Sequence, residues 1–195
     1  MIEINNTTKK LIDEATLKKI VQAFLKFYHK EGWSVSIAII NAASMKNFNE
    51  CYRGVKKTTD VLSFPGYLKD KMGLAGELKY LGEVLLNPSE TKKVREYQDL
   101  LKEIQAISLV KLAKPTKSAK TFGNKLNTLA LTKNLSTPPP IGRLKSKKNQ
   151  QYLFYFLLVH GLLHLVGYND SSKRERHEML YQGKKFLSRQ GYEID

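Results

Sequence analysis

The chain is poor in cysteine and in signals for export or membrane insertion. Cys51 is its one cysteine, so there is no disulfide framework and we expect a reducing compartment. The N-terminal stretch MIEINNTTKKLIDEAT lacks the apolar core of a secretory signal peptide, so we expect a cytoplasmic location. The most apolar run, residues 152–170, is interrupted by histidines and is shorter than the ~20 residues that span a bilayer, so we expect no membrane partner.

Acidic side chains are also scarce. The 195 residues include 33 Lys and Arg against 18 Asp and Glu, which gives a formal net charge of +15. Residues 104–169 contain no Asp or Glu. An excess of this size favours polyanionic partners such as nucleic acid or the ribosome. The length fits a single domain over residues 1–195 with a sizeable core.

A lysine-rich segment, residues 99–148, overlaps most of the region that lacks acidic side chains. Its apolar residues follow no sustained pattern, and Pro138-Pro139-Pro140 adds a stiff extended element. We interpret the segment as a basic insertion, partly mobile, that contacts a polyanionic partner. A solvated linker without a partner is the alternative, because runs of charge are usually only solvated.

Periodic apolar residues predict both helices and strands. Residues 16–31 repeat with helical spacing, and either Thr16 or Asp13 is placed to cap the helix. Residues 33–40 alternate between apolar and polar, as in a strand with one buried face. Further predicted elements are a short helix from about residue 44, strands over 60–64 and 80–86, a helix from about 87 to 107, and a charged helix over 172–189.

The apolar run contains a candidate metal site. His160 and His164 are four residues apart, so on a helix they share one face and can converge on one metal ion, as in the HExxH motif. Gly167 accepts the left-handed backbone that ends a helix. The chain can then fold back and bring Asp170 towards the two histidines. Two histidines and one carboxylate with an open fourth position form the ligand set of a catalytic zinc site.

The same pattern allows two other interpretations. The histidines can be buried side chains with ordinary hydrogen bonds, since a short motif also arises by chance. A zinc peptidase is disfavoured, because HExxH places its general-base glutamate directly after the first histidine, and Gly161 stands there.

Three motifs resemble those of the YbeY family of metal-dependent endoribonucleases and occur in the family's order. The family's HGxLHLxGYDH is matched by HGLLHLVGYND at residues 160–170, its extended YRG…TDVLSFP by residues 52–65, and its LGD followed by apolar residues by residues 81–86. The resemblance covers most of residues 33–98 and 150–190. It implies an α+β fold, in which a small mixed β-sheet packs with helices and the metal site lies at a helix-turn corner.

The resemblance also implies a function. It indicates a single-strand-specific, metal-dependent endoribonuclease with one Zn²⁺ per chain, acting in maturation of ribosomal RNA at the small-subunit 3′ end and in ribosome quality control. Its partners are then ribosomal RNA and the small ribosomal subunit. A non-catalytic, metal-stabilised RNA-binding factor of ribosome biogenesis is the alternative. The oligomeric state does not follow from the sequence.

The family motifs map onto particular residues here. His160, His164 and Asp170 are the implied metal ligands, and His160 and Arg53 the implied catalytic residues. The guanidinium of Arg53 is suited to gripping a phosphate through two hydrogen bonds. Lys56 and Lys57 are expected to add non-specific phosphate contacts. Asp60 is interpreted either as a cap at a strand edge or as a hydrogen-bond partner of a metal-bound histidine.

The match departs from the family pattern at the third ligand. Asp170 stands where the family has histidine, and Asn169 where it has aspartate. An alignment shifted by one residue makes Asp170 the family aspartate and takes His177 as the third ligand. We favour Asp170, because it lies in the tight turn after Gly167, whereas His177 is predicted within the next helix. A site that no longer holds metal is the third alternative.

Overall fold

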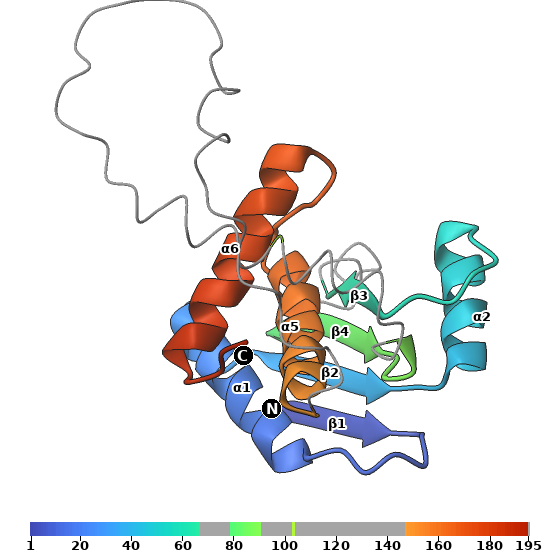
Figure 1. Cartoon of the computed structure of the whole chain (residues 1–195), viewed down its shortest axis with the longest axis horizontal. Coiled ribbons are helices and arrows are strands. Elements are labelled where there is room, and N and C mark those ends of the chain that lie inside the picture. Colours follow the sequence, from blue (N-terminus) through green and yellow to red (C-terminus); the bar gives the residue numbers. More distant parts are fainter. Residues whose placement is uncertain (67–78, 91–102, 104–146, 195) are drawn as a thin grey trace, which may run out of the picture.

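The computed structural model describes residues 1–66, 79–90, 103 and 147–194 (Figure 1). The predicted helix from about 87 to 107 lies almost entirely outside these residues. Most of the lysine-rich segment 99–148 does so as well. Lys147 and Lys148, at its end, lie in the first turn of a long helix.

Four strands form one small mixed β-sheet, which confirms the predicted α+β class. The strands are β1 (Ile2–Asn6), β2 (Ser34–Ile39), β3 (Val61–Pro65) and β4 (Tyr80–Leu86). Their order across the sheet is β1-β2-β4-β3. β1 is parallel to β2 and β2 is parallel to β4, whereas β3 is antiparallel to β4. The antiparallel strand therefore lies at one edge of an otherwise parallel sheet.

β1 was not predicted. Its burial alternates between partly buried and exposed residues, with Ile2 and Ile4 packed against the main core. The strand is short, and polar residues follow it immediately, so the two isoleucines give a weak periodic signal. Pairing with β2 then depends on a contact more than 30 residues away along the chain, which local pattern does not reveal.

The helices are α1 (Glu14–Phe27), α2 (Ala42–Arg53), α5 (Lys147–Leu165) and α6 (Lys173–Arg189). Asp13, not Thr16, caps α1, because its side chain accepts a hydrogen bond from the backbone N–H of Thr16 at 3.0 Å. Ser172 and Glu175 form a capping box at the start of α6, in which each side chain satisfies a backbone donor of the other. The start of α6 is thereby fixed directly after the turn that carries Asp170.

Helix α5 is the centre of the core. It lies against one face of the sheet, with α1 and α6 on the same side (Figure 1). Nearly all its side chains from Tyr152 to Leu165 are buried. The helix approaches the sheet closely because Gly161 has no side chain; a Cβ there would lie 2.6 Å from Cγ1 of Val84. Gly183 likewise allows α6 to lie close to Phe156 on α5.

A smaller apolar cluster forms on the opposite face of the sheet, since successive strand residues point to alternate sides. Its buried members are Ile40, Met45, Leu62 and Leu85. Met45 comes from α2, so this helix packs on the far face, next to the edge strand β3. No helix among the described residues is long and apolar enough to cross a membrane.

Candidate metal centre and active site

The end of α5 is built as a Schellman motif around Gly167. The backbone N–H of Gly167 donates to the carbonyl oxygen of His164 at 3.1 Å, and that of Tyr168 donates to Leu163 at 3.0 Å. Gly167 has φ of 98°, in the left-handed region that side chains disfavour. The motif reverses the chain within a few residues. It therefore carries Asp170 back over the last turns of α5.

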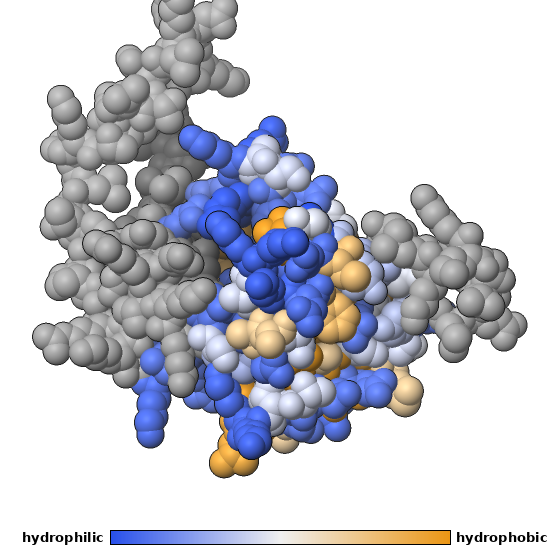
Figure 2. Space-filling view, turned by 90° about the vertical axis from the view of Figure 1, so that its right-hand side faces the viewer, coloured by the Kyte–Doolittle hydropathy of each residue, from blue (hydrophilic) through white to orange (hydrophobic). Residues whose placement is uncertain are grey.

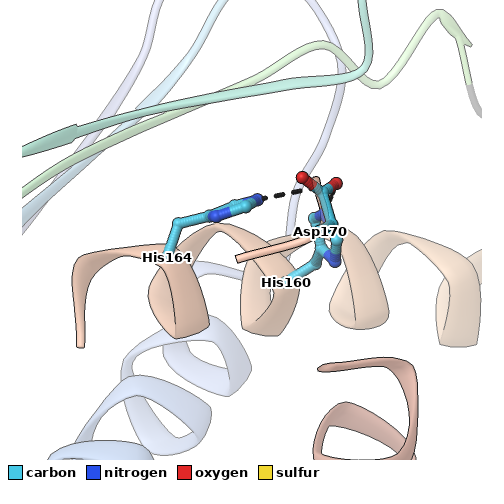
Figure 3. A group of neighbouring side chains, drawn as sticks. All are labelled: His160, His164 and Asp170. Carbon is cyan, nitrogen blue, oxygen red and sulfur yellow. Dashed lines mark ion pairs between the residues drawn. The ribbon is translucent and has the colours of Figure 1, made fainter. Parts of the chain in front are cut away.

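His160, His164 and Asp170 converge above the helix (Figure 3). Oδ2 of Asp170 lies 3.8 Å from Nε2 of His160 and 4.0 Å from Nε2 of His164. One ligand atom from each of the three residues lies within 4.8 Å of the other two. The two imidazole rings are nearly perpendicular, with centroids 4.9 Å apart. Both therefore present Nε2 to the same small volume.

The turn also orients the ring of His164. Its Nδ1 lies 3.0 Å from the backbone oxygen of Tyr168. A carbonyl oxygen only accepts, so in a neutral ring this contact places the proton on Nδ1 and leaves the lone pair on Nε2. A backbone carbonyl behind a ligating histidine is a common support in metal sites.

His160 is held as a neutral imidazole. Its pKa is lowered to about 4, mainly by burial and also by the neighbouring His164 and Arg176, while the carboxylates of Asp170 and Asp60 oppose the shift. Its Nδ1 is buried and has no hydrogen-bond partner among the described residues. Because a metal binds only the unprotonated ring, a lowered pKa reduces competition from protons.

The donor set fits a divalent cation. Donor atoms of a tetrahedral zinc site lie roughly 3.3 Å apart, as follows from bond lengths near 2 Å. The distances from Oδ2 of Asp170 to the two Nε2 atoms, 3.8 and 4.0 Å, are only slightly longer, so small side-chain rotations close the set. Asp170 is the most exposed of the three residues, at 40% of its side chain, and leaves the site open on one side.

His177 does not join this group. It lies on α6 and is exposed. Among residues 1–66, 79–90, 103 and 147–194, the cluster of His160, His164 and Asp170 is the one group of His, Cys, Asp or Glu side chains arranged to hold a metal. The structure therefore supports the turn residue over the helix residue as third donor.

A pocket of about 670 Å³ opens over the three side chains. β3 supplies one wall through Val61, Ser63 and Pro65, and α5 and the start of α6 supply the others. Arg53, the last residue of α2, also lines the pocket. It is exposed. The sequence motifs at residues 52–65 and 160–170 thus meet at one cavity.

The sequence matches the model of one protein family. The model of the family described as Endoribonuclease YbeY matches residues 3–110 and 144–191, which is most of the chain. The chain belongs to the YbeY endoribonuclease family. The matched residues include both motifs that meet at the pocket, and the unmatched stretch between the two matched ranges lies within the lysine-rich segment.

Individual YbeY relatives match along nearly the whole chain. The Endoribonuclease YbeY of Caldicellulosiruptor bescii is 25% identical over 190 residues, covering 97% of this chain and 91% of the relative. That of Alkaliphilus metalliredigens is 25% identical over 195 residues, covering 96% and 94%. Among solved structures, the solution structure of TM1509 from Thermotoga maritima matches with a TM-score of 0.47 and 17% identity, covering 98% of this chain and 91% of that one.

The two lysines predicted to bind phosphate do not line the pocket. Lys56, two residues beyond the C-cap of α2, is paired with Glu50 at 3.2 Å. Lys57 is exposed, and its backbone oxygen accepts a hydrogen bond from the buried Asn49. Neither lysine therefore lies at the metal donors.

Asp60 fulfils the first of the two roles predicted for it, the cap at a strand edge. Its Oδ1 accepts hydrogen bonds from Oγ1 of Thr59 at 3.0 Å and from the backbone N–H of Val61 at 2.8 Å, so it caps the start of β3. It also lines the pocket, and its negative charge acts on the pKa of His160. The carboxylate therefore faces the metal donors as well.

Arg176 was not predicted as a site residue. This residue of α6 lines the same pocket and forms an ion pair with Glu103, with a separation of 3.2 Å. The capping box at Ser172 places the first turns of α6 beside the turn that bears Asp170, and that signal is visible in the sequence. The direction in which α6 then crosses α5 is not visible in the sequence. That direction decides which basic side chain reaches the pocket.

Gly161 excludes the peptidase arrangement. The position that carries the general base in HExxH faces the sheet in this chain, where a Cβ would collide with Val84 and approach Val61. A glutamate has no room there and would point away from the pocket. The general base of the HExxH motif is therefore absent from this position of α5.

Proposed function

We propose that the protein is a zinc-dependent endoribonuclease that cuts single-stranded RNA at the pocket formed by Arg53, His160, His164 and Asp170. The observation that carries this proposal is the convergence of three metal donors with an arginine in one cavity of a YbeY-family chain. Nε2 of each histidine and the carboxylate of Asp170 would hold one Zn²⁺ per chain. When bound, the ion supplies Lewis-acid polarisation of a phosphoryl oxygen and activates water.

The other side chains of the pocket have separate roles in this proposal. Arg53 binds the scissile phosphate through paired N–H groups and offsets charge that develops during cleavage. Arg53 is exposed and lines the pocket, which places its guanidinium within reach of a phosphate bound there. Tyr168 and the Gly167 turn fix the orientation of His164. His160 and Arg53 are thus the residues to which we assign catalysis, with His160 acting as a metal ligand.

Asp170 gives this site one negative charge more than a histidine would. A less positive site makes activated water less acidic. Burial of His160 and the nearby Arg176 act in the opposite direction, because the first lowers the local dielectric and the second adds positive charge. We propose that the site retains turnover with this ligand set.

The biological substrate we propose is ribosomal RNA, near the 3′ end of the small-subunit RNA, with further action in ribosome quality control in the cytoplasm. The net charge of +15 supports a polyanionic partner. The lysine-rich segment 99–148 is proposed to contact the small ribosomal subunit. Deleting residues 111–148 is expected to weaken association with ribosomal RNA and reduce its salt dependence, and unchanged association would contradict this role.

A non-catalytic, metal-stabilised RNA-binding factor is the second candidate. The replacement of histidine by Asp170 and of aspartate by Asn169 favours it. Zinc-loaded protein incubated with single-stranded RNA separates the two candidates. We expect cleavage by the wild type and none by Arg53→Ala at unchanged zinc content. Absence of cleavage by the zinc-loaded wild type would favour the non-catalytic factor, and zinc loss in Arg53→Ala would make Arg53 a structural residue.

A further inference from the structure

Three aromatic rings form a cluster beside the pocket, here called the aromatic shelf: Phe48, Tyr52 and Phe64. Phe48 and Tyr52 are four residues apart on α2 and therefore share one face of the helix. Their rings are nearly parallel, at 11°, with centroids 6.1 Å apart. The ring of Phe64, on β3, meets that of Tyr52 at 60° with a centroid separation of 4.8 Å. Phe64 thus supports Tyr52 from the sheet side.

The shelf is exposed although its members are large and apolar. Tyr52 has 65% of its surface exposed and Phe48 has 38%. The side of the molecule on which α2 lies is mainly hydrophilic, with small hydrophobic patches between polar side chains (Figure 2). Single exposed apolar residues need no explanation. Three rings that hold one another in place with a free outer surface are more typical of a binding surface.

The shelf lies across the edge strand β3 from the pocket, and Arg53 is the residue that connects the two. Arg53, the residue after Tyr52, lines the cavity, and so do Ser63 and Pro65 of β3. Phe64, between these two strand residues, points to the other face of the sheet, where it packs against the smaller apolar cluster. Tyr52 itself is not among the lining residues. An RNA strand whose phosphate is held by Arg53 can therefore continue past the edge of the sheet at β3 and meet the ring of Tyr52, outside the metal donors.

The charge around the shelf suits a nucleic-acid strand. Arg53 and Lys57 are exposed next to it. The α2 segment from Ala42 to Arg53 has no acidic residue in its first turn, and Glu50 is neutralised by Lys56. An exposed aromatic face with cationic side chains alongside is the arrangement by which proteins hold single strands, through base stacking and phosphate contacts.

We infer that Tyr52, supported by Phe48 and Phe64, stacks on an unpaired base of the RNA whose adjoining phosphate is bound by Arg53. This inference rests on the proposed function and adds the source of its preference for single strands. A base inside a duplex is covered by its neighbours and offers no face to Tyr52. The shelf is thus a base-binding subsite next to the cleavage site.

The test compares Tyr52→Ala with Tyr52→Phe in zinc-loaded protein. The substrate is a labelled single-stranded oligoribonucleotide, and KM and kcat for its cleavage are measured together with binding to a duplex of the same sequence. Loss of a stacking ring is expected to raise KM about tenfold, with kcat nearly unchanged. Tyr52→Phe keeps the ring and is expected to behave as the wild type. Duplex binding is expected to be equal in all three proteins.

A second measurement leaves the protein unchanged and alters the RNA. Single abasic nucleotides are placed at successive positions around the cut. One position is expected to raise KM about tenfold for the wild type and to have no further effect in Tyr52→Ala. Independent, multiplying effects of the abasic nucleotide and the substitution would overturn the inference, as would an unchanged KM in Tyr52→Ala. If the wild type neither binds nor cuts single-stranded RNA, both the proposed function and the base-binding subsite are refuted. If the wild type cuts single-stranded RNA and Tyr52→Ala cuts it with the same kinetics, only the base-binding subsite is refuted.

Discussion

The Nδ1 atom of His164 lies 3.0 Å from the backbone oxygen of Tyr168, so the turn that ends α5 also orients a metal donor. The same turn carries Asp170 to within 4.0 Å of Nε2 of His164. Helix termination and ligand placement are therefore one structural feature, and a change in the backbone of the turn is expected to alter both.

Gly167→Ala tests this relationship. A side chain at φ of 98° is expected to lower the free energy of unfolding by about 1–2 kcal/mol and to weaken zinc binding. Gly191→Ala is the matched control: Gly191 closes the same kind of motif after α6, has φ of 80°, and, like Gly167, would leave an added Cβ without a neighbour within 4 Å. Urea unfolding should show similar losses in both variants, whereas a zinc titration should show weaker binding in Gly167→Ala alone. Equal zinc affinity in the two would contradict the coupling.

The ion pair between Arg176 and Glu103 predicts opposite effects of two substitutions. We expect Glu103 to compete with RNA for the guanidinium, so that Glu103→Gln strengthens binding of single-stranded RNA roughly two- to threefold, as loss of a partly exposed pair implies. Arg176→Ala is expected to weaken it and to reduce the slope of log affinity against log salt by about 1. Stability should change little, since the pair is partly exposed and such pairs contribute little.

Arg174→Ala is the control for this pair. Arg174 is exposed on the same helix and does not line the pocket, so cleavage kinetics should stay close to those of the wild type. Weaker RNA binding in Glu103→Gln would show that the carboxylate supports binding and would refute the competition.

The lowered pKa of His160 predicts how stability depends on pH in zinc-free protein. The pKa falls from an ordinary 6.5 to about 4 on folding, mainly through burial. The stabilising contribution of the neutral ring is therefore fully present above pH 6.5 and is lost as pH falls through about 4. Because folding is linked to protonation of His160, the free energy of unfolding is expected to fall by on the order of 3 kcal/mol across that interval. Urea unfolding of chelator-treated protein at about pH 7 and about pH 4.5 measures this loss of stability. An NMR titration of His160 with a midpoint near the ordinary 6.5 would contradict the lowered pKa.

The sequence predicted most elements because each has a local signal. The alternation in 33–40 identified β2, and the two candidate caps, Asp13 and Thr16, set the start of α1 within a few residues. The capping residue of α1 could not be chosen between Asp13 and Thr16, since both residue types cap helices well. In the structure Asp13 is the cap, and its carboxylate accepts hydrogen bonds from both the backbone N–H and the hydroxyl of Thr16.

The sequence predicted the three metal donors of the site but not all the residues that surround them. Spacing placed His160 and His164 on one face of a helix, and Gly167 indicated the reversal that brings Asp170 near. Arg176 and the aromatic shelf depend on how α6 crosses α5 and how α2 lies on the far face of the sheet. Those angles arise from close approaches such as that at Gly161, which no local pattern encodes.

The central claim, a metal held by His160, His164 and Asp170, is tested most directly by zinc content per chain. Mass spectrometry of the purified, dialysed protein should find about one zinc in the wild type and in His177→Ala. It should find almost none in His164→Ala or Asp170→Ala, with folding of each variant confirmed by circular dichroism. Retention of zinc by Asp170→Ala together with its loss from His177→Ala would contradict this claim and assign the third ligand to α6.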